Sequence, residues 1–272
     1  MIALGYPNRP ATASGGSWLA AAPLTNVTTA DFTNTARSTD ATTTSTKILL
    51  DLGAAYPLRF FALANTNLSD AATWVIKLGT TSGAGDLLTT SSGPVWQLGG
   101  ETALAAVGVN DTLPFYRRQF QNIYVHSAFI SARYVTFELS DTANAAGFVE
   151  VGRAFASGGY VPSVNASYGL KDGITDLSSK TKSESGAQTP AKRRRIRNVS
   201  FVLEQRTMTE ADMLHDMQRM LGTVEEVLYV PDIDDAALTQ RYGFIGTMRE
   251  LSSLEYPYYN RRALPVSLEE IV

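Results

Sequence analysis

Residues 132–140 read ARYVTFELS, and the fold class is most clearly visible in this segment. Its side chains alternate, with Val135, Phe137 and Leu139 on one side of the chain and more polar residues on the other. Alternation with period two, in β-branched and aromatic residues, is the pattern of a strand with one buried face. Residues 73–79, TWVIKLG, repeat the pattern. The sequence therefore predicts a mainly β chain.

Working outward, further short apolar segments flank these two stretches. They are ILLDL at 48–52, RFFALAN at 59–65, NIYVHSA at 122–128 and FVEVGRAFA at 148–156. Gly, Pro, Ser and Asn punctuate the intervals between them, as turn residues do. Many short strands at this spacing are typical of a β-sandwich. We expect the sandwich to occupy residues 1–160.

The second half, residues 161–272, has a different pattern and predicts a β domain with one helix. A polar segment at 171–197 is expected to form a long hairpin arm, although a linker is the alternative. It leads into a strong strand at 197–205. Apolar segments predict closing strands, namely VEEVLYV at 224–230, RYGFIGTMREL at 241–251 and ALPVSLEEI at 263–271.

The helix of this domain has clear start and stop signals. Thr207 stands three residues before Glu210, which is the spacing of a capping box. Gly222 suits the left-handed position at which such a helix stops. An apolar stripe follows helical spacing through Met213, Leu214, Met217, Met220 and Leu221. The loop PDIDDAALTQ that follows the next strand is interpreted as a loop or a short helical turn.

Composition excludes several functional classes. Among 272 residues there is no Cys, so disulfides, thiolate metal sites and Cys nucleophiles are impossible. The net charge of −3 provides no general attraction to nucleic acid. No apolar run approaches the roughly 20 residues of a membrane span, and no secretory signal is recognisable at the N-terminus. We expect a chain made in a cytoplasm, without membrane insertion.

The strongest charge feature lies in the predicted arm. Residues 171–197 hold eight Lys and Arg against three Asp and Glu. Lys192, Arg193, Arg195 and Arg197 are the candidate subunit-interface residues, because the planar guanidinium pairs bidentately with carboxylates. A solvated strand face is an alternative. Specific nucleic-acid binding is not expected, because no aromatic residues interleave with these charges to stack on bases.

Catalytic motifs are absent from the sequence. His126 and His215 fall in a predicted strand and a predicted helix without a partner nearby, and neither GxSxG nor HExxH occurs. The glycines at 79, 83 and 85 follow a strand, but their spacing is not that of a dinucleotide-binding loop, so a hairpin turn is favoured. The sequence predicts no catalytic residue and no cofactor.

Two weaker candidates remain. Asp232, Asp234 and Asp235 could offer oxygen ligands to Ca²⁺, but the EF-hand spacing fails and a solvated loop that caps a short turn is favoured. Trp18 and Trp96 lie beside Gly and Pro residues and are the candidate glycan-contact residues. Core packing or loop anchoring is the alternative for both indoles.

The first half resembles the galactose-binding, discoidin-type jelly roll. The similar segments are KILLDLGAAYPLRFFALANTNLS at 47–69 and ARYVTFELSDTANAAGFVEVGRAFA at 132–156, with Arg133, Tyr134 and Glu150 at matching positions. The resemblance spans residues from about 15 to 158. It implies a β-sandwich whose ligand residues lie on variable rim loops, and it assigns no ligand residue here.

The second half resembles the β-sandwich-plus-helix unit of tail-tube and distal-tail proteins from tailed bacteriophages. The similar features are the polar hairpin arm, the basic strand RRRIRNVSFVLE, the capped helix TMTEADMLHDMQRMLG and the terminal PVSLEEI. Here the tube-like domain comes second, whereas the common distal-tail order places it first.

Together the resemblances imply a structural component of a phage tail tip or baseplate ring, located in the virion. Its implied partners are copies of itself in a homo-oligomeric ring, the tail tube, hub and fibres, and host glycans. One alternative is a carbohydrate-binding module or host-adsorption protein without catalysis. Another is a glycan hydrolase, which needs paired carboxylates roughly 5–10 Å apart in a cleft.

Overall fold

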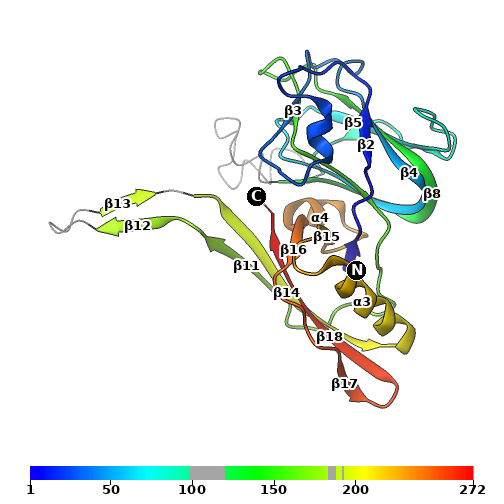
Figure 1. The fold of residues 1–272 in the computed structure, drawn as a ribbon, viewed down its shortest axis with the longest axis vertical. Helices are drawn as coiled ribbons and strands as arrows, with labels where there is room; N and C mark the ends of the chain where they lie inside the picture. The colour runs from blue at the N-terminus through cyan, green and yellow to red at the C-terminus, as the bar shows by residue number, and fades with distance from the viewer. Residues whose placement is uncertain (98–119, 183–187, 192, 272) are drawn as a thin grey trace.

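The computed structural model describes residues 1–97, 120–182, 188–191 and 193–271. Within them the chain is mainly β, as predicted, with two seven-stranded sheets that each form the centre of one half of the molecule. Figure 1 shows one half above the other, with a two-stranded arm extending sideways from the lower half.

The first sheet has the order β10-β4-β8-β5-β6, with β2 paired to β4 and β7 paired to β5. Its strands are β2 (Thr12–Ser14), β4 (Ile48–Ala64), β5 (Thr73–Gly79), β6 (Leu88–Thr89), β7 (Gly93–Pro94), β8 (Asn122–Ser140) and β10 (Arg153–Ser157). The short pair β3 (Ala36–Arg37) and β9 (Glu150–Val151), with the 3₁₀ helix η1 (Leu24–Thr28), covers one face.

Strands β4 and β8 are each a single long strand, where the sequence predicted two shorter ones. They pair antiparallel along almost their whole length, with register shifts between Asp51 and Tyr56 and between Leu58 and Phe60. Such bulges absorb extra residues and bend a strand without ending it. Gly53, at φ +79°, supplies the left-handed backbone conformation that this irregularity needs.

The predicted alternation is confirmed in the first core. Trp74, Ile76 and Leu78 of β5 are buried on one face, and they pack with Val135 and Phe137 of β8. The core also contains apolar residues of η1 and of the β3–β9 pair, so these elements form its opposite layer.

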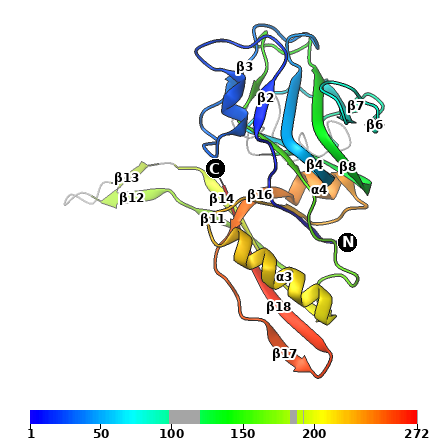
Figure 2. The ribbon, with the colours of Figure 1, turned by 45° about the vertical axis from the view of Figure 1, so that its right-hand side comes forward.

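The second sheet has the order β1-β15-β16-β18-β14-β11, and β17 pairs with β18. Its strands are β1 (Ala3–Gly5), β11 (Lys171–Asp176), β14 (Arg195–Arg206), β15 (Val227–Val230), β16 (Phe244–Met248), β17 (Glu255–Tyr258) and β18 (Arg261–Glu270). Helix α3 (Met208–Leu221) lies along this sheet beside β18, as Figure 2 shows.

The helix signals in the sequence are confirmed. Thr207 and Glu210 form both bonds of the capping box, and Gly222 ends the helix with a positive φ of 55°. The carboxylate of Glu210 also accepts from the backbone N–H of Ser163, at 2.9 Å. Burial by itself raises the pKa of Glu210, but the hydrogen bonds from Ser163 and Thr207 outweigh it and lower the pKa to about 2.

One detail of α3 differs from expectation. The predicted stripe is too wide, because Leu214, Met217 and Leu221 are buried whereas Met213 and Met220 are exposed. The segment after β15, interpreted from the sequence as a loop or a short helical turn, contains a second helix, α4 (Ala236–Tyr242), whose first turn is stabilised by Asp235 as N-cap. The short helical turn is therefore confirmed.

The two halves are joined by a shared apolar cluster and a buried ion pair. Phe60, Ile123 and Phe155 of the first sheet pack against Leu228 and Ile245 of the second. β1 pairs with β15 although it precedes the first sheet in the chain. β1 thus lies before residue 160 in the chain but belongs to the second sheet. The division into domains at residue 160 stays a prediction.

The ion pair joins Arg153 of β10 to Glu226, with 2.7 Å between Nη2 and Oε2. Their side chains are only 10% and 8% exposed. The side chain of Asn8 donates to the same carboxylate oxygen at 2.8 Å, and Arg153 also donates to the carbonyl of Thr29 at 2.8 Å. Because both charges are desolvated, removal of either partner would leave the other charge buried and uncompensated.

Candidate functional site

The arm is a polar ribbon that leaves the body of the protein. β12 (Ser179–Lys182) and β13 (Gln188–Ala191) continue the hairpin begun by β11 and β14, and every residue of both strands is exposed. Figures 1 and 2 both show it extending well away from the two halves. The hairpin-arm prediction is confirmed, and the linker alternative is wrong. In the described part of the chain, β11 is the last strand of its sheet.

The basic run divides into residues with different surroundings. The side chain of Arg197 is engaged within its own subunit. Its guanidinium pairs with the Glu270 carboxylate at 2.5 Å and donates to the carbonyl of Gly243 at 3.1 Å. Arg195 is 59% exposed and lies 3.6 Å from the Asp176 carboxylate. Arg193 is exposed near the outer part of the arm. Lys192 lies outside the described residues.

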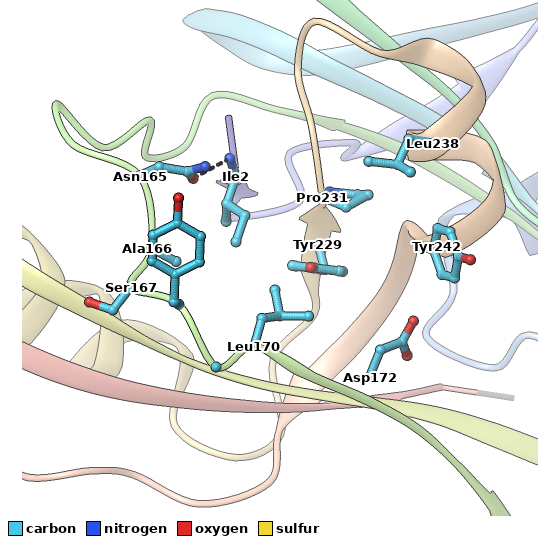
Figure 3. Close-up of a pocket in the computed structure, with 12 residues that line it drawn as sticks. Ile2, Asn165, Ala166, Ser167, Leu170, Asp172, Tyr229, Pro231, Leu238 and Tyr242 are labelled. Carbon is cyan, nitrogen blue, oxygen red and sulfur yellow. Dashed lines mark hydrogen bonds between the residues drawn. The ribbon is translucent and has the colours of Figure 1, made fainter.

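A pocket of about 600 Å³ opens at the root of the arm. Its walls come from distant parts of the sequence: Ile2, the segment 165–172, the end of β15 and helix α4. Figure 3 shows Tyr229 at the centre, with Asn165 on one side and Tyr242 on the other. Sequence reasoning missed this pocket, because its walls meet only in the folded chain.

The pocket combines apolar walls with one carboxylate. Tyr168 is fully exposed at its edge, and Leu170 and Tyr242 are also exposed in part. Asp172 is exposed as a residue, yet partial burial of its carboxyl group raises its pKa, and the charge of Arg197 opposes part of this shift. Tyr229 is buried, and burial together with the Asp172 charge raises the pKa of its phenol. The pocket can therefore offer aromatic surface and a poorly solvated negative charge to a cation.

The two histidines remain apart from any catalytic arrangement in the described residues. His126 lies on β8, where Nδ1 is 2.9 Å from the carbonyl oxygen of Ala128. His215 is exposed on α3. The glycine-rich segment after β5 is a hairpin turn, as favoured from the sequence, because Leu78 pairs with Leu88 of β6.

The acidic loop is occupied by contacts within the chain. Asp232 binds the N-terminal ammonium group of Met1, which lowers the pKa of its carboxyl group. Asp234 lies 3.8 Å from the same ammonium, and Asp235 caps α4. Among the described residues, no group of three or more His, Asp or Glu is arranged to hold a metal ion. Nor does any described helix have the length and apolar character needed to cross a membrane.

The two candidate glycan-contact tryptophans have different environments. Trp96 is buried, and its indole N–H donates to the carbonyl of Ser69 at 2.8 Å, so this ring is not available for stacking on a ligand. Trp18 is half-buried against the first core. The residue is exposed in part, although its indole nitrogen is buried.

Neither a family model nor a curated protein matches the sequence. The fold is similar to several solved structures. CBM32-1 from a family 31 glycoside hydrolase of Clostridium perfringens is 14% identical, with a TM-score of 0.37 over 56% of this chain and 99% of that one. The family 32 CBM from C. perfringens NanJ, in complex with galactose, is 13% identical, with a TM-score of 0.38 over 57% and 98%.

A fucose binding module of Streptococcus pneumoniae is 12% identical, with a TM-score of 0.37 over 56% of this chain and 95% of that one. At these TM-scores the likeness assigns no ligand, partner or residue role to this chain.

Proposed function

We propose that this chain is a non-catalytic structural subunit that assembles with copies of itself and with neighbouring proteins through its hairpin arm. The observation that carries the proposal is the full exposure of β12 and β13 on a ribbon that leaves the body. A lone two-stranded ribbon is at best marginally stable in water. An arm of this kind gains stability when a neighbour covers it.

The assembly that fits is a ring built by repeated heterologous contacts. An arm on one side of each subunit meets a different surface on the next, and rings form when the rotation between subunits closes. The edge of β11 supports such contacts, because an unpaired strand can add to the sheet of a neighbour. We place the ring in the tail tip or baseplate of a phage virion, which rests on the resemblance of the second half to distal-tail proteins.

The test compares the full chain with a shortened arm. Asp176 and Arg195 are paired across the arm, so residues 177–194 can be replaced by Asn-Gly, which makes a two-residue hairpin turn. In sedimentation velocity we expect multi-copy species for the full chain and a monomer for the shortened one. The melting temperature should change little, since the deleted strands are exposed. A full chain that stays monomeric at every concentration, also in electron micrographs, refutes the proposal.

A second candidate function, glycan binding by the first half, is favoured by the exposed part of Trp18. A partly exposed indole beside polar loops can stack on a sugar ring while its other face packs on the core. The test is a glycan array with the full chain and with Trp18→Ala. Phe129→Ala is the control, because Phe129 is an exposed aromatic residue elsewhere in this half. Silence of the full chain on all glycans, or equal signals for all three proteins, excludes the candidate.

A further inference from the structure

The pocket at the root of the arm has the features of a docking site. Four large apolar side chains in its lining are exposed, which is unusual for neighbouring residues on a monomer surface. They are Tyr168 at 108%, Leu170 at 41%, Tyr242 at 38% and Leu238 at 38%. With a volume of about 600 Å³, it has the size of a cleft that receives a specific group.

We propose that this pocket receives the lysine-bearing end of β12 from a second copy of the chain, with Lys180 and Lys182 directed to the Asp172 carboxylate and the tyrosine rings beside it. The inference rests on the proposed function, since it names the surface that the arm of the next subunit meets. Both lysines are exposed, and they stand two residues apart on one face of the strand.

Charge complementarity selects this occupant. β12 carries two exposed lysines and no acidic residue, whereas Asp172 is the carboxylate among the described residues that line the pocket. The charge of Arg197 near Asp172 is already matched by Glu270 at 2.5 Å. A cation that docks over tyrosine rings next to a partly desolvated carboxylate gains both cation–π and ionic attraction.

The length of the arm agrees with a head-to-tail contact. Ten residue steps separate Asp172 at the root from Lys182 near the tip, which at about 3.3 Å per residue is roughly 33 Å. This reach is enough to carry Lys182 beyond the body of its own subunit and onto the surface of a neighbouring one. The same contact, repeated, generates a ring or a filament.

A charge swap in the full-length chain tests the inference by sedimentation velocity. Asp172→Lys, and separately Lys180→Asp with Lys182→Asp, should each weaken self-assembly roughly tenfold or more. Combining all three substitutions in one chain should restore it. Glu250→Lys is the control for net charge, since Glu250 is exposed in a loop away from the pocket lining. Circular dichroism confirms that each variant is folded, and Asp172→Asn replaces Asp172→Lys if the latter is not.

A mixing experiment gives a second readout. The Asp172→Lys chain keeps its arm but lacks a working pocket, whereas the chain with the shortened arm keeps only the pocket. Each should be monomeric alone, and together they should form a single 1:1 dimer. Tyr168→Ala should weaken assembly, whereas Tyr259→Ala, which removes an equally exposed tyrosine from the β17–β18 turn, should not.

The outcomes separate the inference from the proposed function. If the shortened arm abolishes assembly but Asp172→Lys assembles like the full chain, the arm docks elsewhere and the pocket inference is overturned while the proposed function stands. The same holds if the charge swap does not restore assembly. If the unaltered chain never assembles, both fail together.

Discussion

The buried ion pair between the two halves supports a quantitative prediction about their coupling. Replacing Glu226 by Gln keeps the shape of the side chain and removes its charge, which leaves the guanidinium of Arg153 buried without a counter-charge. Breaking a buried pair in this way typically costs about 3–5 kcal/mol. We expect the lower end, about 3 kcal/mol, because Arg153 keeps its hydrogen bond to the Thr29 carbonyl at 2.8 Å.

Urea unfolding with two optical probes measures this cost. All three tryptophans belong to the first half, so their fluorescence reports on the first core, whereas circular dichroism at 222 nm reports mainly on α3. We expect coincident transitions for the unaltered chain, because the shared apolar cluster and the ion pair make the halves one cooperative unit. In Glu226→Gln both transitions should move to lower urea concentrations. If the contacts between the halves break before either half unfolds, the two probes should report different midpoints.

The control is an exposed ion pair on the arm. Asp176→Asn removes the partner of Arg195, and these side chains are 50% and 59% exposed. Solvent screening should keep its effect within the error of the unfolding measurement. If Glu226→Gln lowers the free energy of unfolding by no more than this control does, the Arg153–Glu226 pair is not desolvated in solution, and the predicted coupling of the two halves is wrong.

The remaining predictions concern the helix cap, the arm root and the tryptophans. The lowered pKa of Glu210, about 2 in the folded chain, contributes stability above its unfolded value near 4.5 that is lost as the pH falls from about 4.5 to 2. Glu210→Gln should therefore flatten the pH dependence of the unfolding free energy over this window by about 3 kcal/mol; parallel curves for the two proteins contradict it. Arg197→Met should lower stability by about 3 kcal/mol, because the buried Glu270 carboxylate loses its counter-charge and keeps the backbone N–H of residue 197. Arg193→Met should leave the melting temperature unchanged; equal effects refute the distinction. Trp96→Ala should cost about 3–5 kcal/mol as a core truncation, clearly more than Trp18→Ala in chemical unfolding; the reverse order would show that the burial is misassigned.

Features set by neighbouring residues were predictable from the sequence. The alternation in 73–79 and 132–140 predicted strands with one buried face, and the structure buries Trp74, Ile76 and Leu78 together. The spacing of Thr207 and Glu210 predicted the start of α3. These signals are local, because the period of a strand and the capping of a helix depend on residues a few positions apart. The arm was predictable for the same reason, from a polar segment that leads into a strong strand.

The continuity of β4 and β8 was not predictable from local signals. Gly53 and Pro57 interrupt the alternation, and a turn is the ordinary interpretation of such residues. Only pairing with the neighbouring strand shows that the irregularity is a bulge inside one long strand. The ion pair between Arg197 and Glu270 was not predictable from local signals either, because Glu270 is 73 residues further along the chain.

Local patterns in the amino-acid sequence predict a mainly β chain with a capped helix and a basic arm, and the lack of Cys excludes thiol chemistry. Three features appear only in the folded molecule: β1 joins the second sheet, Arg153 pairs with Glu226 across the two halves, and Asp172 and Tyr242 line one pocket with Ile2. Strand order and contacts between side chains so far apart in the chain depend on which buried surfaces fit one another, and that information is spread over the whole chain.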